Sequence, residues 1–308
     1  MRLGTRGSKL ALAQAAKVCR ILSEKGVNAS PVIIRTSGDI HTSEPFHVIK
    51  GGVGAFVREI DEVLLSGDID GAVHSLKDVP TKRPDEIAMA AVLRRESALD
   101  VAITRSGEKL KELREGAIVG TSSTRRTALI KKHYPHLATK NIRGNVDTRL
   151  GKLGNGEYDA IMLAEAGLIR LDINMQVERL DPYEFVPSAN QGVIAVVARR
   201  DSEAFGTLST LNDPDTWLET RVERIITAYM DGGCVVPMGA YAKLDGDRID
   251  VVCEVLSLDG SRQARVREKI PVKDHEAGAL KLAVRLAACG GKELVEAAKR
   301  ELGGCGGE

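Results

Sequence analysis

Strand and helix signals alternate along the first two-thirds of the chain, and this alternation is the feature that most constrains the fold. Short apolar segments typical of buried strands precede longer segments with helical apolar spacing, such as 55–67, where Val57, Ile60 and Leu64 share one face. The strand-like segments are RLGT (2–5), PVIIRT (31–36), DGAVHS (70–75), DVAITR (100–105), AIVG (117–120) and YDAIMLA (158–164). The alternation predicts α/β domains with mostly parallel sheets, whose ligands bind beyond the carboxyl ends of the strands.

The pattern changes after the helical segment TWLETRVERIITAYM (216–230). Three strand-like segments, 241–246, 248–257 and 264–272, are separated by Asp-Gly turns, and an alanine-rich helical stretch follows over 275–301. This predicts a smaller α+β domain with an antiparallel sheet. We expect domain boundaries near residues 95, 190 and 214.

Charge and cysteine usage exclude several classes of function. Lysine and arginine total 44 against 43 acidic residues, so overall charge does not favour non-specific nucleic-acid binding. No segment has the roughly 18 apolar residues of a membrane span, and residues 1–18 lack the apolar core of a signal peptide. Five scattered cysteines without a C-x-x-C pair predict reduced thiols rather than disulfides or a zinc site. We therefore expect a cytoplasmic protein without a metal.

Arginines recur where the predicted strands end. Arg6 follows RLGT, GTSSTRR carries Arg125 and Arg126 after AIVG, and RGNVDTR contains Arg143 and Arg149. Hydroxyls and free N–H groups at a helix start bind negative oxygens, and guanidiniums add bidentate bonds. Each segment taken alone has a simpler interpretation than an anion site: a serine only caps the helix, and the arginines are solvated. The three segments together predict a polyanion site, for phosphate or carboxylate alike.

The segment HSLKDVPT adds a carboxylate to this cationic region. Pro80 prevents a simple continuation of the strand, so Lys77 and Asp78 are expected at a strand edge that faces a crevice. Asp78 would repel an anion, but it suits a ligand that also carries N–H groups or develops positive charge. The alternative is a Lys77–Asp78 surface pair worth ~0–1 kcal/mol. We expect His74 to be structural rather than a base.

Cys234 lies in DGGCVVPMG, after two glycines and before a proline, which indicates an accessible loop. Such a thiol is a nucleophile or an attachment point. No histidine or asparagine motif completes a protease arrangement, which favours attachment. Cys253 and Cys289 are expected to be buried apolar residues.

These motifs, in this order, resemble the porphobilinogen deaminase family. The resemblance covers nearly the whole chain and includes RGSKLALAQA, GGVGAFVREI, HSLKDVPT, GTSSTRR, RGNVDTRL, GEYDAIMLAEAGL, SANQG and GGCVVPMG. It implies an enzyme that polymerises four porphobilinogen molecules into hydroxymethylbilane and releases ammonia each time. It also implies a dipyrromethane cofactor, made from substrate and joined as a thioether to Cys234.

The resemblance further implies two α/β domains like those of type II periplasmic binding proteins and a smaller C-terminal α+β domain. Domain 1 would comprise residues 1–94 and 192–213, domain 2 residues 95–191, and domain 3 residues 214–308. Residues 192–199 (GVIAVVAR) would thus return to the first sheet, which the composition does not show. The expected partner is porphobilinogen, with no nucleic acid or membrane, and we expect a monomer.

By motif position, Asp78 would accept hydrogen bonds from pyrrole N–H groups and stabilise the cationic azafulvene that forms as ammonia leaves. The residues expected to bind the carboxylate arms of substrate and cofactor are Arg6, Ser8, Gln14, Lys77, Ser123, Arg125, Arg126, Arg143, Arg149 and Gln191. Many relatives have a lysine as the third residue of the GG-x-G loop, where this chain has Val53. Lys50 and Arg58 are nearby sources of charge.

Two other functions fit parts of the sequence. A non-catalytic binding protein for a small anion would use the same α/β domains, but it needs no loop cysteine. A phosphate-handling transferase could use GTSSTRR, but the chain lacks a G-x-x-x-x-G-K-[ST] loop, and Asp78 and Cys234 would have no role.

Overall fold

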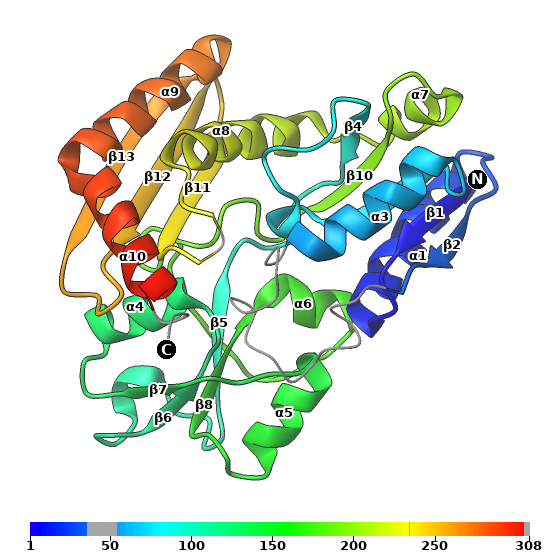
Figure 1. The fold of residues 1–308 in the computed structure, drawn as a ribbon. Helices are drawn as coiled ribbons and strands as arrows, with labels where there is room; N and C mark the ends of the chain where they lie inside the picture. The colour runs from blue at the N-terminus through cyan, green and yellow to red at the C-terminus, as the bar shows by residue number, and fades with distance from the viewer. Residues whose placement is uncertain (36–53, 234, 305–308) are drawn as a thin grey trace. The chain divides into compact units, whose positions relative to one another are not determined.

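The computed structural model describes residues 1–35, 54–233 and 235–304, which form two compact units (Figure 1). The first unit comprises Met1–Ser97, Ile169–Ile173 and Gln191–Trp217. The second comprises Ala98–Leu168, Asn174–Asn190 and Leu218–Glu308. Val53, where the sequence departs from the pattern of the family it resembles, lies outside the described residues, as do the nearby Lys50 and Cys234.

The first unit contains a five-stranded sheet in the order β2-β1-β3-β10-β4. Its strands are β1 (Arg2–Thr5), β2 (Ser30–Ile33), β3 (Gly71–Ser75), β4 (Ile87–Val92) and β10 (Ile194–Arg199). β1 is parallel to β2 and β3, whereas β10 is antiparallel to β3 and β4. The predicted return of residues 192–199 to the first sheet is therefore observed, as β10.

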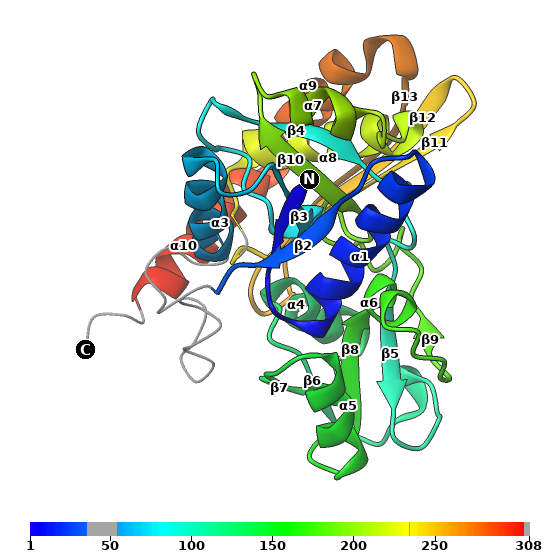
Figure 2. The ribbon, with the colours of Figure 1, turned by 90° about the vertical axis from the view of Figure 1, so that its right-hand side faces the viewer.

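Helices cover both faces of this sheet, because its strands alternate their apolar side chains between the two sides. Val73 packs with α1 (Lys9–Glu24) and α7 (Glu203–Ser209), whereas Ala72 packs with α3 (Gly54–Ser66). Figure 2 shows α1 and α3 on opposite sides of β1 and β3.

The second unit contains another five-stranded sheet, in the order β7-β6-β8-β5-β9. Its strands are β5 (Asp100–Thr104), β6 (Ile118–Gly120), β7 (Ala138–Lys140), β8 (Ala160–Ala164) and β9 (Glu178–Arg179). β6 is parallel to β7 and β8, and β5 is antiparallel to β8 and β9. Its helices are α4 (Thr124–His133), α5 (Val146–Gly154) and α6 (Glu165–Arg170). In each five-stranded sheet, three neighbouring strands are parallel as the sequence predicts, and the other two join them in antiparallel pairs.

The C-terminal part has the predicted antiparallel sheet, formed by β11 (Met238–Asp245), β12 (Arg248–Leu256) and β13 (Gln263–Pro271). It shares one apolar core with α8 (Pro214–Met230), α9 (His275–Leu286) and α10 (Lys292–Gly304). The prediction of one helical stretch over 275–301 is wrong. Gly290 has φ +94°, which an α-helix cannot accommodate, so the chain breaks between α9 and α10.

Candidate active site

In the first unit, three chain segments meet at one edge of the sheet. Because β1 and β3 are parallel neighbours, Arg6, which follows β1, and the short helical turn Leu76–Asp78, which follows β3, emerge at the same edge. β10 runs the other way with Ile194 opposite Ser75, so Gln191, just before β10, is also at this edge. The predicted residues of this unit therefore gather beyond the carboxyl ends of two parallel strands.

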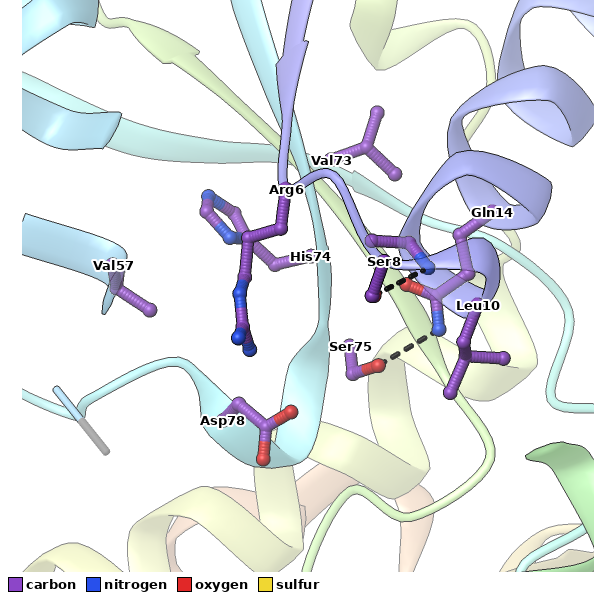
Figure 3. Close-up of a pocket in the computed structure, with 10 residues that line it drawn as sticks. Arg6, Ser8, Leu10, Gln14, Val57, Val73, His74, Ser75 and Asp78 are labelled. Atoms are coloured by element: carbon purple, nitrogen blue, oxygen red, sulfur yellow. Dashed lines mark hydrogen bonds between the residues drawn. The ribbon is translucent and has the colours of Figure 1, made fainter. Parts of the chain in front are cut away.

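A cavity of about 220 Å³ opens at this edge. Figure 3 shows Arg6 and Asp78 extending toward one another within it. Asp78 is half-buried, and its carboxylate has no hydrogen bond or ion pair with any residue that the structure describes. The cavity thus combines a cation with an available acceptor. Its lining residues are Arg6, Ser8, Leu10, Ala11, Gln14, Val57, Val73, His74, Ser75 and Asp78.

Ser8 and Gln14 fix the wall that α1 contributes. The Ser8 hydroxyl accepts from the Ala11 N–H at 3.3 Å and caps the helix. Gln14 is buried, and its Nε2 donates to Ser75 Oγ at 2.8 Å (Figure 3). This bond ties α1 to the end of β3 and leaves the Gln14 side chain oriented along the cavity.

Lys77 does not form the surface pair with Asp78 that was one interpretation of the sequence. Its ammonium donates to the side-chain oxygen of the buried Gln191 at 3.4 Å. The next residue, Gly192, has φ +84°, and a Cβ there would lie 2.0 Å from the Ser97 carbonyl oxygen. Only glycine fits this position, which fixes the backbone that presents Gln191.

His74 is a buried, uncharged residue in the wall of the cavity. Burial, reinforced by the positive charges of Arg83 and Arg6, lowers the pKa of His74 to about 3. The imidazole is therefore neutral at physiological pH and cannot act as a cation there. This agrees with the structural role predicted from the sequence.

His74 makes a specific contribution to the acid sensitivity of the fold. Its pKa is about 3 in the folded state against 6.5 for the free side chain, so stability falls as pH drops below 6.5 toward 3. Between pH 7 and pH 5 this linkage lowers the free energy of unfolding by about 2 kcal/mol. Between pH 7 and pH 5, we expect the free energy of unfolding of His74→Gln to fall by about 2 kcal/mol less than that of the wild type. Urea unfolding at both pH values measures this difference. An unchanged difference between the two pH values would show that His74 does not titrate on unfolding.

In the second unit, a buried arginine pair follows β6. Ser123 caps α4 by accepting from the Arg126 N–H at 3.4 Å. The side chains of Arg125 and Arg126 share the carboxylate of Asp100, at 2.8 and 2.7 Å, and all three residues are buried. Burial lowers the pKa of Arg125, while Asp100 opposes this effect. One carboxylate balances only one of the two guanidiniums, so the pair retains positive charge.

Arg149 adds a third cation to this cluster. Its Nε donates to the Gly144 carbonyl oxygen at 2.8 Å, and burial together with the charge of Arg126 lowers its pKa. Arg143 is half-buried ahead of α5, and its carbonyl oxygen accepts from Lys152 at 3.4 Å. Arg125, Arg126 and Arg149 therefore form a cationic cluster, which suits an anionic ligand.

Sequence reasoning missed Asp100 and Ser75. Asp100 begins an apolar strand, and nothing in the spacing of DVAIT indicates that two arginines from a later segment share its carboxylate. The prediction that Cys289 is buried is also wrong, because it lies exposed at the break between α9 and α10. Cys253 is buried as predicted, and burial raises its pKa to about 12.

The described part of the chain has no helix long and apolar enough to cross a membrane. Within the same ranges, no cluster of three or more His, Cys, Asp or Glu side chains could hold a metal ion. The fold and the charged groups define an α/β protein with two mixed five-stranded sheets and a small C-terminal part around a three-stranded sheet. Both five-stranded sheets carry groups suited to anions.

Comparisons with known proteins identify the family. A family model described as "Porphobilinogen deaminase, dipyromethane cofactor binding domain" matches residues 1–207, and "Porphobilinogen deaminase, C-terminal domain" matches residues 217–288. A "Probable porphobilinogen deaminase" of Methanocella arvoryzae is 62% identical over 98% of this chain and 99% of that one. The "Porphobilinogen deaminase" of Maridesulfovibrio salexigens is 39% identical over 96% of each chain. The chain belongs to the porphobilinogen deaminase family.

Among solved structures, substrate-binding domain 2 of Lactococcus lactis GlnP is 14% identical, with a TM-score of 0.41. That match covers 68% of this chain and 85% of the other. A lipoprotein of the YaeC family from Enterococcus faecalis is 11% identical, with a TM-score of 0.41, and the match covers 70% of this chain and 92% of the other.

Proposed function

We propose that this protein is a hydroxymethylbilane synthase. It joins four porphobilinogen molecules head to tail into hydroxymethylbilane, releases one ammonia at each addition, and uses a covalently attached dipyrromethane as primer. The observation that carries this proposal is the cavity of the first unit, in which a carboxylate without a partner among the described residues, Asp78, lies beside the cation Arg6. A pyrrole with carboxylate arms requires both kinds of group.

The residues fit a dipyrromethane. Its ring N–H groups are donors that match the acceptor of Asp78, and its acetate and propionate arms match guanidiniums. When bound, the dipyrromethane supplies the pyrrole carbon from which the chain grows. In the first unit, Asp78 is the group we expect to accept hydrogen bonds from its ring N–H groups.

Asp78 acts on the charge that develops in the substrate. The C–N bond of the aminomethyl arm breaks, ammonia leaves with the electron pair, and the ring becomes a cationic azafulvene. A new carbon–carbon bond then forms at the methylene carbon, and the ring that attacks it loses a proton. A fixed carboxylate near the ring stabilises the cation more than neutral porphobilinogen, so its effect grows toward the transition state.

The other residues of the first unit bind and orient carboxylate arms. Arg6 extends into the cavity and provides charge-assisted hydrogen bonds (Figure 3). Ser8, at the start of α1, contributes a hydroxyl, and Gln14 forms the wall beside it. We propose further carboxylate contacts from Lys77 and Gln191, which hold each other at the same sheet edge.

In the second unit, Ser123, Arg125, Arg126, Arg143 and Arg149 bind further carboxylate arms. Asp100 holds the guanidiniums of Arg125 and Arg126 in fixed positions while leaving net positive charge for the ligand. Such preorganisation reduces the cost of ordering two long side chains on binding.

Loss of one guanidinium from this cluster should be severe. We expect Arg126→Leu to be inactive or to accumulate as protein without cofactor, because removing one partner of a buried ionic group costs about 3–5 kcal/mol. Intact mass reports cofactor content, and porphobilinogen consumption reports turnover. The exposed Arg114→Leu is the matched control and should behave as the wild type. A folded Arg126→Leu protein with a full cofactor load and near-normal turnover would disprove the assignment.

A receptor that only binds a small anion is the alternative. Such a receptor would gain from Arg6 but not from Asp78, whose charge opposes the ligand. The test is direct: purified protein should exceed its sequence mass by one dipyrromethane, attached in our proposal to Cys234. It should also give a pyrrole colour with an acidic aldehyde reagent. Protein at its sequence mass, without colour, would favour the receptor.

We further propose that the protein acts as a monomer in the cytoplasm, without nucleic-acid or membrane partners. We retain the proposed division into domain 1 (1–94 and 192–213), domain 2 (95–191) and domain 3 (214–308). The nearly balanced charge and the absence of long apolar segments in the sequence support the proposed lack of nucleic-acid and membrane partners.

A further inference from the structure

The loop between α8 and β11, residues 231–237, contains Cys234, and its described residues are held from three directions. On the α8 side, Lys292 donates to the carbonyl oxygens of Tyr229 and Met230 at 3.2 and 3.1 Å. The next residue, Asp231, has φ +52° and pairs with Lys299 at 3.2 Å. The helix end and the start of the loop are thus anchored to α10.

The end of the loop on the β11 side is anchored by the core of the second unit. Val236 is buried, and the Pro237 carbonyl oxygen accepts from the Leu256 N–H at 2.9 Å. Gly239 packs so closely on Val186 that a Cβ would lie 2.6 Å from its carbonyl oxygen. These contacts fix the described residues at the β11 end of the loop.

Val235, the residue directly after Cys234, has a hydrogen-bond partner outside the loop. The Val235 carbonyl oxygen accepts from Thr124 Oγ1 at 2.7 Å, whereas the Val235 side chain is 39% exposed. Thr124 is the first residue of α4, directly before Arg125 and Arg126. This hydrogen bond therefore joins the loop to the helix that carries the arginine pair.

We propose that Thr124 is a positioning residue for cofactor attachment and chain growth, an inference that rests on the proposed function. The hydrogen bond holds the described backbone of this loop, at Val235, to the first residue of α4. Thr124 thereby keeps the attachment loop close to the start of α4 and to its guanidiniums. Loss of the hydroxyl widens the range of loop conformations and lowers the fraction from which attachment proceeds.

The test compares full-length protein prepared without cofactor from a host that makes no porphobilinogen. Thr124→Val removes the hydroxyl at constant shape, Thr124→Ser retains it, and Thr127→Val makes the same change one turn along α4. Porphobilinogen is added, and the mass increment of one dipyrromethane is followed over time. Deuterium exchange of the peptide spanning 231–237 and thermal melting are measured on the same samples.

We expect Thr124→Val to load threefold to tenfold more slowly, which corresponds to about 0.6–1.4 kcal/mol at 1.36 kcal/mol per tenfold. Exchange in the loop should rise while the melting temperature stays near that of the wild type. Thr124→Ser and Thr127→Val should both load at the wild-type rate. The inference would be overturned if Thr124→Val loaded cofactor and exchanged deuterium like the wild type. It would also be overturned if Thr124→Ser loaded cofactor as slowly as Thr124→Val. Neither result would affect the proposed function. Failure of the wild type to gain mass would instead overturn the proposed function, and the inference with it.

Discussion

Replacing Cys234 by serine is expected to abolish the cofactor and, with it, all turnover. A serine hydroxyl is far less nucleophilic than a thiolate at neutral pH, so the thioether cannot form. Intact mass should then equal the sequence mass of the variant, and porphobilinogen should not be consumed. The effect is all-or-none, because a chain without its primer has nothing to extend.

Cys289 provides the control, since it is an exposed thiol in the described part of the chain. Cys289→Ser should keep the mass increment and the activity of the wild type. An active Cys234→Ser protein, or loss of the mass increment in Cys289→Ser, would show that the cofactor is attached elsewhere.

Asp78→Asn is expected to reduce turnover by at least about a hundredfold while the protein folds and loads its cofactor. Asparagine keeps the shape of the side chain but removes the charge that favours the azafulvene. The expected size follows from general acid–base and electrostatic contributions of ~10²–10⁴-fold. Asp78→Glu should retain more activity, because the charge is displaced by one methylene rather than lost.

The control for this charge change is Asp68→Asn, which alters an exposed carboxylate before the other end of β3. It should leave turnover unchanged. Turnover is to be compared only among variants whose mass shows a full cofactor load. If Asp78→Asn matched the turnover of the wild type, or exceeded that of Asp78→Glu, charge at this position would not contribute to the reaction.

Much of the fold could be predicted because each strand is a short apolar segment bounded by turn residues. The apolar segments GAVHS and AIMLA, for example, predict β3 and β8 directly. The order of strands within a sheet could not be read this way. β10 lies between β3 and β4, and its apolar sequence IAVVAR would suit any buried position, so only the family resemblance predicted its return.

The sequence predicted which types of residue form the candidate site, but it did not predict which of them form ion pairs. Arg6 and Asp78 were expected near each other because both follow predicted strands, and the structure gathers them in one cavity. Asp100 was not expected, because long-range ion pairs leave no periodic signal. Its two bonds to arginines change the interpretation of Arg125 and Arg126 from solvated cations to fixed, partly neutralised ones.

The most direct test of the central proposal is the stoichiometry of the reaction with porphobilinogen. Purified protein is incubated with substrate, and porphobilinogen, ammonia and linear tetrapyrrole are measured in the same samples over time. We predict one ammonia for each porphobilinogen consumed and one hydroxymethylbilane for every four. Porphobilinogen that binds but is recovered unchanged, with no ammonia released, would contradict the proposal and identify a receptor instead of an enzyme.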